Sequence, residues 1–276
     1  MTQTPLTRDL IADPELWRLS MMICVDGVEV VMRRVTGEPE LLTSSLKYDA
    51  GAQSSAAALE ELVYANPLLL AQFGKVDIVL RTTAFQILPP EVAHDADAVE
   101  ALLDMLPHPD GRPVAYVSEI DDRNSVVNFV DKGVANFLAR TFFAVDPVSH
   151  LSVFGQYFTH QSRLGNSGKM YVNISEKYMD ILAFNSLGLS IANTYVCTDD
   201  DNAAYYVLAA ARAVGFDFTA DELLISGNVE RRATLMTTLR KFANYVMPTI
   251  FPATAYRGDR NALRAPFELI VLPLCE

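Results

Sequence analysis

Apolar and polar residues alternate in two long blocks of the chain, and each block predicts three strands joined by tight turns. We expect the strands of the first block at 17–25, 28–35 and 40–48, and those of the second block at 169–175, 178–185 and 189–197. Asp26-Gly27 separates the first two strands and is a strong hairpin signal, because both central residues of a type I′ turn need a positive φ. Each block therefore predicts an antiparallel meander.

Apolar residues at helical spacing follow each block. The helices that this spacing predicts are 56–72, which Pro67 kinks or ends, 95–106, 147–163, 198–215 and 230–245. Further strands are expected at 75–81, with an extension at 83–88, at 114–120 and at 223–226, while 125–143 is mixed and an apolar run at 267–274 ends the chain. Each half thus has the order of three strands, a helix, a strand, a helix and a further strand.

This order of elements repeats between the two halves, although the residues themselves do not. It predicts an α/β protein with a duplicated fold, in which two βββαβαβ domains each contain a mixed sheet. We place the boundary between residues 1–145 and residues 146–276.

Several stretches of sequence carry a family resemblance. They are LSIANTYVCTDDDNAAYYVLAAARAVG at 189–215, LLISGNVER at 223–231, LPLCE at 272–276, and the segments LSMMICVDGVEVVM and VLRTTAFQILPPE of the first half. They resemble the family called domain of unknown function 3822, found mainly in Bacteroidetes, and the order of elements resembles the actin-like ATPase superfamily. The resemblance covers nearly the whole chain. It implies an actin-like, ribonuclease H-like fold and brings no assigned activity.

Active members of the superfamily carry an Asp, a Gly and hydroxyl donors in the first hairpin of each half, where turn amides wrap the phosphates and the Asp organises Mg²⁺. The matching first turn here has Asp26 and Gly27 but no hydroxyl, and Glu29 adds a negative charge. The matching second turn, 175–178, has neither Asp nor Gly. We favour an ordinary hairpin turn over a phosphate loop at the first position, and expect phosphate binding to be lost at the second.

The superfamily also has a Gly-Gly pair after the fourth strand of its second half, where the backbone approaches adenosine. Ser226, Gly227 and Asn228 occupy that place with one glycine. They equally suit a strand-to-helix turn in which Gly227 has a positive φ and Asn228 caps the next helix, and we favour this interpretation. With Asp26 and Gly27 they make a degenerate nucleotide site. We expect no cofactor, and Mg-ATP is the alternative.

We expect no catalytic group and no metal site. Asp199, Asp200 and Asp201 stand at a helix start, where consecutive acids point in different directions and suit capping better than metal binding. The four histidines lack metal-ligand spacing, and the three cysteines lie far apart and suggest buried thiols. The N-terminus lacks a signal-peptide pattern, and the apolar runs are too short to cross a membrane. A cytoplasmic location is therefore expected.

Charge is distributed unevenly along the 276 residues, which carry 34 acidic and 22 basic side chains and a net charge of −12. Residues 1–145 hold 21 acids and 11 bases, net −10, and residues 146–276 hold 13 acids and 11 bases, net −2. Such acidity argues against a surface built for nucleic acid. One basic group lies late in the chain: Arg231, Arg232, Arg240, Lys241, Arg257, Arg260 and Arg264. A shared face would suit a phosphate group, RNA, an acidic partner or the chain's own acidic half, and a solvated helix face is the alternative.

Together these observations predict a non-catalytic protein with an actin-like fold that acts as a cytoplasmic interaction scaffold for a protein partner, with a homo-oligomer as a further option. The alternative is a divergent nucleotide-binding ATPase or phosphotransferase that uses Asp26, Gly27 and Gly227.

Overall fold

The computed structural model describes residues 5–106, 111–162, 167–251 and 265–275. They form two compact units. The first unit contains the chain up to Ser118 together with Ser125–His150, and the second contains Glu119–Asn124, the residues from Leu151 to 251, and those from Pro266 onward. The single boundary expected after residue 145 stays a prediction. Short 3₁₀ turns at Arg8–Leu10 and Pro14–Leu16 precede the first strand.

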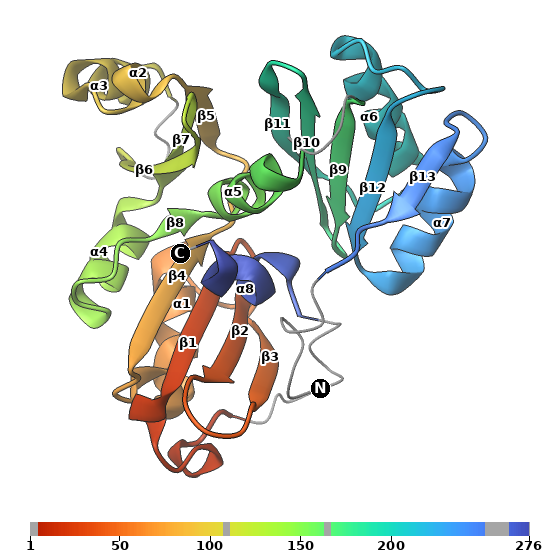
Figure 1. Cartoon of the computed structure of the whole chain (residues 1–276). Helices are drawn as coiled ribbons and strands as arrows, with labels where there is room; N and C mark the ends of the chain where they lie inside the picture. Colours follow the sequence, from red (N-terminus) through yellow and green to blue (C-terminus); the bar gives the residue numbers. More distant parts are fainter. Residues whose placement is uncertain (1–4, 107–110, 163–166, 252–264, 276) are drawn as a thin grey trace. The chain divides into compact units, whose positions relative to one another are not determined.

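A five-stranded sheet forms the base of the first unit (Figure 1). Its strands are β1 (Trp17–Cys24), β2 (Gly27–Arg34), β3 (Leu41–Lys47), β4 (Lys75–Leu80) and β8 (Val148–Ser149). They lie in the order β3-β2-β1-β4-β8, with the first three antiparallel and β4 parallel to both of its neighbours. The predicted strands 17–25, 28–35, 40–48 and 75–81 are therefore confirmed.

Two helices cover this sheet and complete the first core. They are α1 (Ser55–Ala65) and α4 (Lys132–Thr141). Alternate residues of the strands pack against the apolar stripes of both helices, as alternation on a half-buried sheet predicts. The core includes Leu19, Met21, Val28, Val30, Leu59, Leu62, Phe137 and Leu138. Helix α1 ends before Pro67, as expected, and a 3₁₀ turn (Pro67–Leu70) follows it.

Between β4 and α4 the chain forms an additional layer that the sequence did not predict. It contains β5 (Phe85–Leu88), α2 (Pro90–Ala93), α3 (Ala96–Met105), β6 (Val114–Asp121) and β7 (Asn124–Val130). The strands make a separate sheet of order β5-β7-β6. The expected helix 95–106 and strand 114–120 exist but belong to this layer. The second helix and the fifth strand of the first unit's five-stranded sheet are instead α4 and β8. Residues 125–143 resolve into β7 and α4. Periodicity predicts an element's type but not the sheet it joins.

The second unit repeats the strand order of the first. Its elements are α5 (His150–Ser162), β9 (Lys169–Ile174), β10 (Tyr178–Asn185), β11 (Gly188–Val196), α6 (Asp200–Ala213), β12 (Glu222–Gly227), α7 (Val229–Leu239), β13 (Tyr245–Pro248) and α8 (Phe267–Val271), followed by a 3₁₀ turn (Leu272–Leu274). The strands lie in the order β11-β10-β9-β12-β13. This order corresponds position by position to β3-β2-β1-β4-β8, and it confirms the predicted duplication.

Two elements near the C-terminus differ from the expectation. The helix expected to reach residue 245 ends at Leu239, and the fifth strand is β13 rather than the run 267–274. That run is the helix α8 with its 3₁₀ turn, and every α8 residue is buried. A short run that is apolar on all sides gives the same pattern for a buried strand and a buried helix, so the sequence could not separate them.

Candidate functional site

The first hairpin turn consists of Val25 and Asp26, one residue earlier than predicted. Cys24 pairs with Gly27, so Gly27 already belongs to β2. Neither turn residue has a positive φ, and the type I′ assignment is therefore wrong. Glycine is required at position 27 for another reason: a Cβ atom there would lie 2.0 Å from the carbonyl oxygen of Leu46 in β3. Close packing of two strands explains this glycine without a phosphate.

Two carboxylates surround this turn, and one lysine serves both. Lys47 Nζ lies 3.2 Å from Asp26 Oδ2 and 3.8 Å from Glu29 Oε1. The hydroxyl of Ser45 donates a hydrogen bond of 2.7 Å to Glu29 Oε1. A phosphate site needs converging amide donors or an excess of positive charge. The first hairpin instead presents two carboxylates for one ammonium group.

Tyr48 follows β3 and lies behind the same turn. Its backbone N–H donates to the carbonyl oxygen of Asp26 at 3.1 Å. Burial, with smaller contributions from Cys24 and Asp26, raises the pKa of the Tyr48 hydroxyl above its ordinary value. The group therefore stays protonated and neutral at physiological pH.

The second hairpin turn, between β9 and β10, is closed by its own serine. The backbone N–H of Ser175 donates to the carbonyl oxygen of Tyr178 at 2.8 Å, and the N–H of Tyr178 donates to Ser175 Oγ at 3.1 Å. The serine hydroxyl is thus committed to the turn itself.

An arginine from α7 reaches into this second hairpin. Arg231 Nη1 donates to three backbone carbonyl oxygens, those of Ser175 at 2.7 Å, Glu176 at 3.0 Å and Cys197 at 2.8 Å. Its Nε donates to Asp200 Oδ1 at 2.8 Å. The side chain is 13% exposed. We call this set of contacts the Arg231 clamp. It joins the β9–β10 turn, the end of β11 and the start of α6 through one guanidinium group.

Ser226 and Gly227 are the last two residues of β12, and Asn228 joins this strand to α7. Gly227 has a φ of +97°, and a Cβ atom there would lie 2.1 Å from the carbonyl oxygen of Ile174. Asn228 Oδ1 caps α7 by accepting from the N–H groups of Glu230 and Arg231, each at 3.1 Å. The favoured interpretation of Gly227 and Asn228 as turn and cap residues fits this geometry.

The basic residues that we grouped from the sequence occupy different places. Arg231 lies inside the clamp near the start of α7, while Arg240 follows its last residue, about 14 Å along the helix axis. Arg240 Nη2 donates to the carbonyl oxygen of Val246 at 3.3 Å. Arg232 is half-buried, and Arg240 and Lys241 are exposed. Arg257, Arg260 and Arg264 lie outside the described residues.

Of the three consecutive aspartates, Asp199 has the capping role that we expected. Asp199 Oδ1 accepts from the N–H groups of Asp201 at 2.8 Å and Asn202 at 3.0 Å, and Asp200 is part of the Arg231 clamp. Within the described ranges, no three His, Cys, Asp or Glu side chains converge in a way that could hold a metal ion. Among the described helices, none has both the length and the apolar composition needed to cross a membrane.

A buried polar network in the second unit escaped the sequence analysis. Asn173 Nδ2 donates to Glu268 Oε1 at 3.0 Å and approaches Asp180 Oδ2 at 3.4 Å. Thr194 Oγ1 donates to Asp180 Oδ1 at 2.9 Å, and Ser226 Oγ donates to Asn173 Oδ1 at 3.1 Å. All five residues are buried. Asp180 is the one charge inside the strand YMDILAFN, a signal that could have pointed to the network.

Comparison with known proteins supports the fold. A model of the family described as "Protein of unknown function (DUF3822)" matches residues 18–246. A crystal structure from Bacteroides thetaiotaomicron VPI-5482, of a protein with an actin-like ATPase fold and unknown function, is similar with a TM-score of 0.78 and 21% identity, over 96% of this chain and 98% of that one. A comparison with curated proteins gave no match.

A second solved structure is the PilM–PilN type IV pilus biogenesis complex. It is similar with a TM-score of 0.55 and 12% identity, and the match covers 95% of this chain and 98% of that one. Both likenesses are likenesses of fold. The expected actin-like fold is confirmed.

Proposed function

Because this chain belongs to the DUF3822 family and has an actin-like ATPase fold, we propose that it is a non-catalytic scaffold that uses this fold to bind a protein partner. In this proposal the protein acts through a surface that binds the partner and not through a bound nucleotide. It also places the protein in the cytoplasm, as the sequence led us to expect.

The observation that carries the proposal is the Arg231 clamp. In a phosphate-binding hairpin the turn offers N–H donors to the ligand. In the second hairpin of this chain three carbonyl oxygens converge on one guanidinium group, so the turn presents acceptors to a cation that the protein supplies itself. Two of the guanidinium nitrogens of Arg231 are engaged by these carbonyls and by Asp200. A phosphate group would have to displace an ion pair whose arginine is largely buried to reach them.

The first hairpin supports the same conclusion. Asp26 and Glu29 share one lysine, and Gly27 serves the packing of β2 against β3. A polyphosphate approaching this turn would meet two carboxylates. The PilM–PilN structure supports the second half of the proposal, since it is a complex of two proteins and contains a similar fold.

A thermal-shift experiment tests the catalytic half of the proposal. A nucleotide present at ten times its dissociation constant would stabilise the native state by about 1.4 kcal/mol and raise the melting temperature by a few degrees. We expect no shift with millimolar Mg-ATP or Mg-ADP. A clear rise would instead favour the alternative, a divergent ATPase or phosphotransferase that uses Asp26, Gly27 and Gly227.

An ATP turnover assay sharpens this test. Phosphate release above background that disappears in the Asp26→Ala variant would overturn the proposal, because no contaminating ATPase would respond to that change. The partner half needs a separate experiment. Proteins that co-purify from the native cell are produced individually and mixed with the purified chain, and we expect one of them to form a stoichiometric complex.

A further inference from the structure

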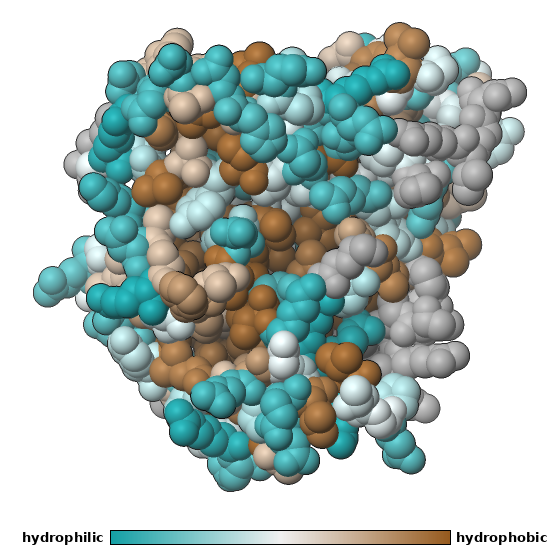
Figure 2. Space-filling view, turned by 60° about the vertical axis from the view of Figure 1, so that its left-hand side comes forward, coloured by the Kyte–Doolittle hydropathy of each residue, from teal (hydrophilic) through white to brown (hydrophobic). Residues whose placement is uncertain are grey.

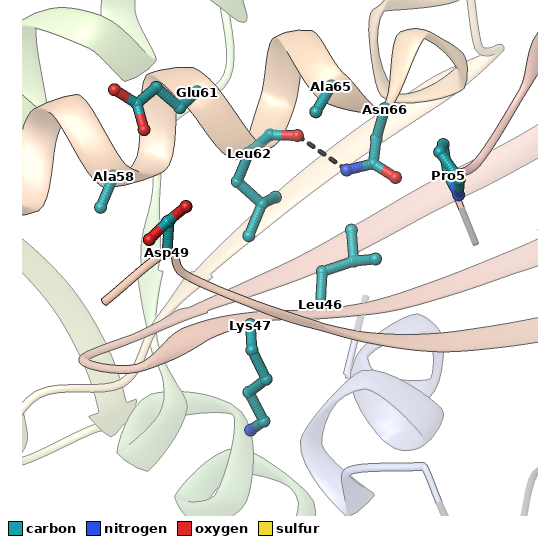
Figure 3. Close-up of a pocket in the computed structure, with 9 residues that line it drawn as sticks. All are labelled: Pro5, Leu46, Lys47, Asp49, Ala58, Glu61, Leu62, Ala65 and Asn66. Atoms are coloured by element: carbon teal, nitrogen blue, oxygen red, sulfur yellow. Dashed lines mark hydrogen bonds between the residues drawn. The ribbon is translucent and has the colours of Figure 1, made fainter. Parts of the chain in front are cut away.

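The edge of a sheet specifies its partner more closely than an apolar surface does, because its row of N–H and C=O groups pairs with an extended strand. Apolar side chains reach the surface among polar ones on the face shown in Figure 2, and single exposed residues are common on proteins. The cavity between α1 and the end of β3 has a mixed lining, in which Lys47, Asp49 and Glu61 lie beside apolar side chains (Figure 3). Neither of these features indicates a particular ligand.

Most edge strands of the described sheets are protected against pairing with another chain. Two of them are short, since β8 has two residues and β5 has four. β13 ends in Pro248, which has no N–H group, and the carbonyl oxygen of Val246 accepts from Arg240. The longer edge strands β3 and β6 carry charged residues, among them Lys47 at the end of β3. Short length, proline and charge are the devices by which proteins keep sheet edges from pairing.

β11 lacks these devices. It has nine residues and contains no charged residue and no proline. It lies at the end of the second unit's sheet, where no described strand pairs with its outer side. A bulge leaves Ser190 opposite no residue of β10, near the turn, whereas 191–196 pair regularly with β10. The second unit thus presents a regular, uncharged edge from Ile191 to Val196.

Hydrogen bonds within the second unit show which backbone groups of β11 point outward. The N–H of Cys197 donates to the carbonyl oxygen of Lys177 at 2.7 Å, on the side of β10. Backbone groups of successive residues point alternately to the two sides of a strand, so those of Ala192 and Thr194 point to the open side. Asn193 Oδ1 accepts from the N–H of Thr194 at 2.9 Å. Local side-chain bonds of this kind compete with strand pairing and can be exchanged for it.

The residues around Asn193 are compatible with their own reversed order. Ile191 and Tyr195 lie two residues before and after it on the same face, and both pack against the core of the second unit. Ala192 and Thr194 flank it on the other face. An asparagine amide both donates and accepts, so two Asn193 side chains can bond to each other, whereas a charged residue at this centre would face its own charge. This edge therefore suits an antiparallel copy of itself.

A row of tyrosines continues from β11 onto α6. Tyr195 stacks on Tyr206 with ring centroids 4.7 Å apart, and Tyr205 meets Tyr206 edge-on at 5.8 Å. Tyr205 is 67% exposed. Tyrosine is enriched in protein interfaces, because its ring adds apolar area and its hydroxyl stays hydrated or bonded. A strand added to β11 lies against Tyr195, the first ring of this row.

We propose that two copies of this chain associate through their β11 strands, which run antiparallel about a two-fold axis at Asn193. Ala192 of each copy then lies opposite Thr194 of the other, and Ile191 lies opposite Tyr195, an aromatic–β-branched pair that stabilises strand pairing. The second units' two five-stranded sheets become one continuous sheet. Both copies use the same edge, so the contact is complete in a dimer. It goes beyond the proposed function, since it concerns contacts between copies and not the partner.

The acidity of the chain opposes association only weakly at this edge. Residues 1–145 carry a net charge of −10 and residues 146–276, which include β11, a net charge of −2. At physiological ionic strength charges are screened over about 8 Å, so the uncharged edge decides the contact. Because few residues pair, we expect a dimer that depends on concentration.

Sedimentation equilibrium of the full chain over a concentration series at 0.15 M salt tests the proposal. We expect the average mass to rise from one chain to two and to stop there. Asn193→Asp keeps the acceptor for the Thr194 N–H but places two carboxylates opposite each other in the dimer, so it should weaken association by at least about tenfold. Asn185→Asp is the control: it adds the same charge at the end of β10 and keeps the acceptor for the Leu187 N–H. It should associate as the wild type does.

A wild-type chain that stays monomeric at all concentrations overturns the proposal and leaves the edge to a strand of another protein. Growth beyond a dimer overturns it as well, and so does equal association of Asn193→Asp and Asn185→Asp. The proposed scaffold function does not depend on these results, because it is tested by nucleotide binding and by a complex with a different protein.

A cysteine at the two-fold axis tests the register. Asn193 faces its own copy in a pair without backbone hydrogen bonds, where Cα atoms lie about 4.5 Å apart, within the range of a disulfide. Asn193→Cys should therefore give a disulfide-linked dimer with oxidised glutathione. Ser190→Cys is the control, since six residues of strand, about 20 Å, separate the two copies of position 190. Cross-linking of both variants alike, or of neither although both show the circular dichroism of the wild type, contradicts the pairing about Asn193.

Discussion

The two hairpins that occupy equivalent positions in the duplicated order of elements are closed by different means. In the first, a charged surface pair and a close strand contact suffice, and Lys47 remains half exposed. In the second, Arg231 reaches from α7, 56 residues along the chain from Ser175, and is largely buried. The comparison teaches that equal topology does not require equal chemistry. The alternation of apolar residues predicts both meanders, whereas the contacts that close each turn depend on the side chains that lie near it.

The glycine beside the second hairpin should give the largest effect. We expect Gly227→Ala to lower the free energy of unfolding by about 3 kcal/mol or more, because a Cβ atom there meets the Ile174 backbone and the φ of +97° adds strain. Gly215→Ala is the matched control, since Gly215 has a φ of +69° but no atom within 4 Å of its Cβ position. It should cost only about 1 kcal/mol. Equal losses in urea unfolding would show that contact with Ile174 does not matter.

Removal of the Arg231 clamp should come next. Arg231→Ala leaves three carbonyl groups and Asp200 without their buried donor, and we expect a loss of about 2–4 kcal/mol in urea unfolding. Arg231→Lys should recover part of this loss, because an ammonium group keeps the charge but not the fork of donors. Arg232→Ala, at the neighbouring position, should change stability by less than about 0.5 kcal/mol. An Arg231→Ala variant as stable as the wild type would refute the clamp.

Alkaline pH should expose the buried tyrosine of the first hairpin. Folding raises the pKa of Tyr48, so above pH of about 10 the unfolded chain loses a proton that the native state keeps. The stabilising contribution of Tyr48 is thus complete below pH of about 10 and declines as the pH rises further. We expect the melting temperature of Tyr48→Phe to fall less between pH 9 and pH 11 than that of the wild type. Parallel falls would contradict this.

The smallest effect belongs to the surface pair of the first hairpin. Lys47→Ala removes the ammonium group shared by Asp26 and Glu29, and we expect a loss of less than about 1 kcal/mol. This loss should shrink further at 1 M salt, where charges are screened over about 3 Å. A loss as large as that of Arg231→Ala would mean that the two hairpins depend on their cations alike.

The sequence predicted the strands of both meanders because a half-buried strand repeats every two residues. It could not predict that β5, β6 and β7 form their own sheet, since periodicity carries no information on pairing partners. It also placed Asp26-Gly27 in the turn. Glycine is required at position 27 because a Cβ atom there would collide with the Leu46 carbonyl oxygen, a contact that only the folded chain reveals. For the site, the capping role of Asp199 followed from local rules. The Arg231 clamp did not, because it depends on one side chain reaching residues distant in sequence.

The buried network around Asn173 has a consequence for synthesis of the protein. Glu268 lies in α8, whose Phe267 packs against Phe154 and Phe158 of α5. These contacts link the second unit's sheet to a helix that is synthesised 95 residues after Asn173. Domains generally fold in the order in which they are made. The second unit therefore cannot reach its final packing until α8 has been synthesised, and until then Asn173 lacks its hydrogen bond to Glu268.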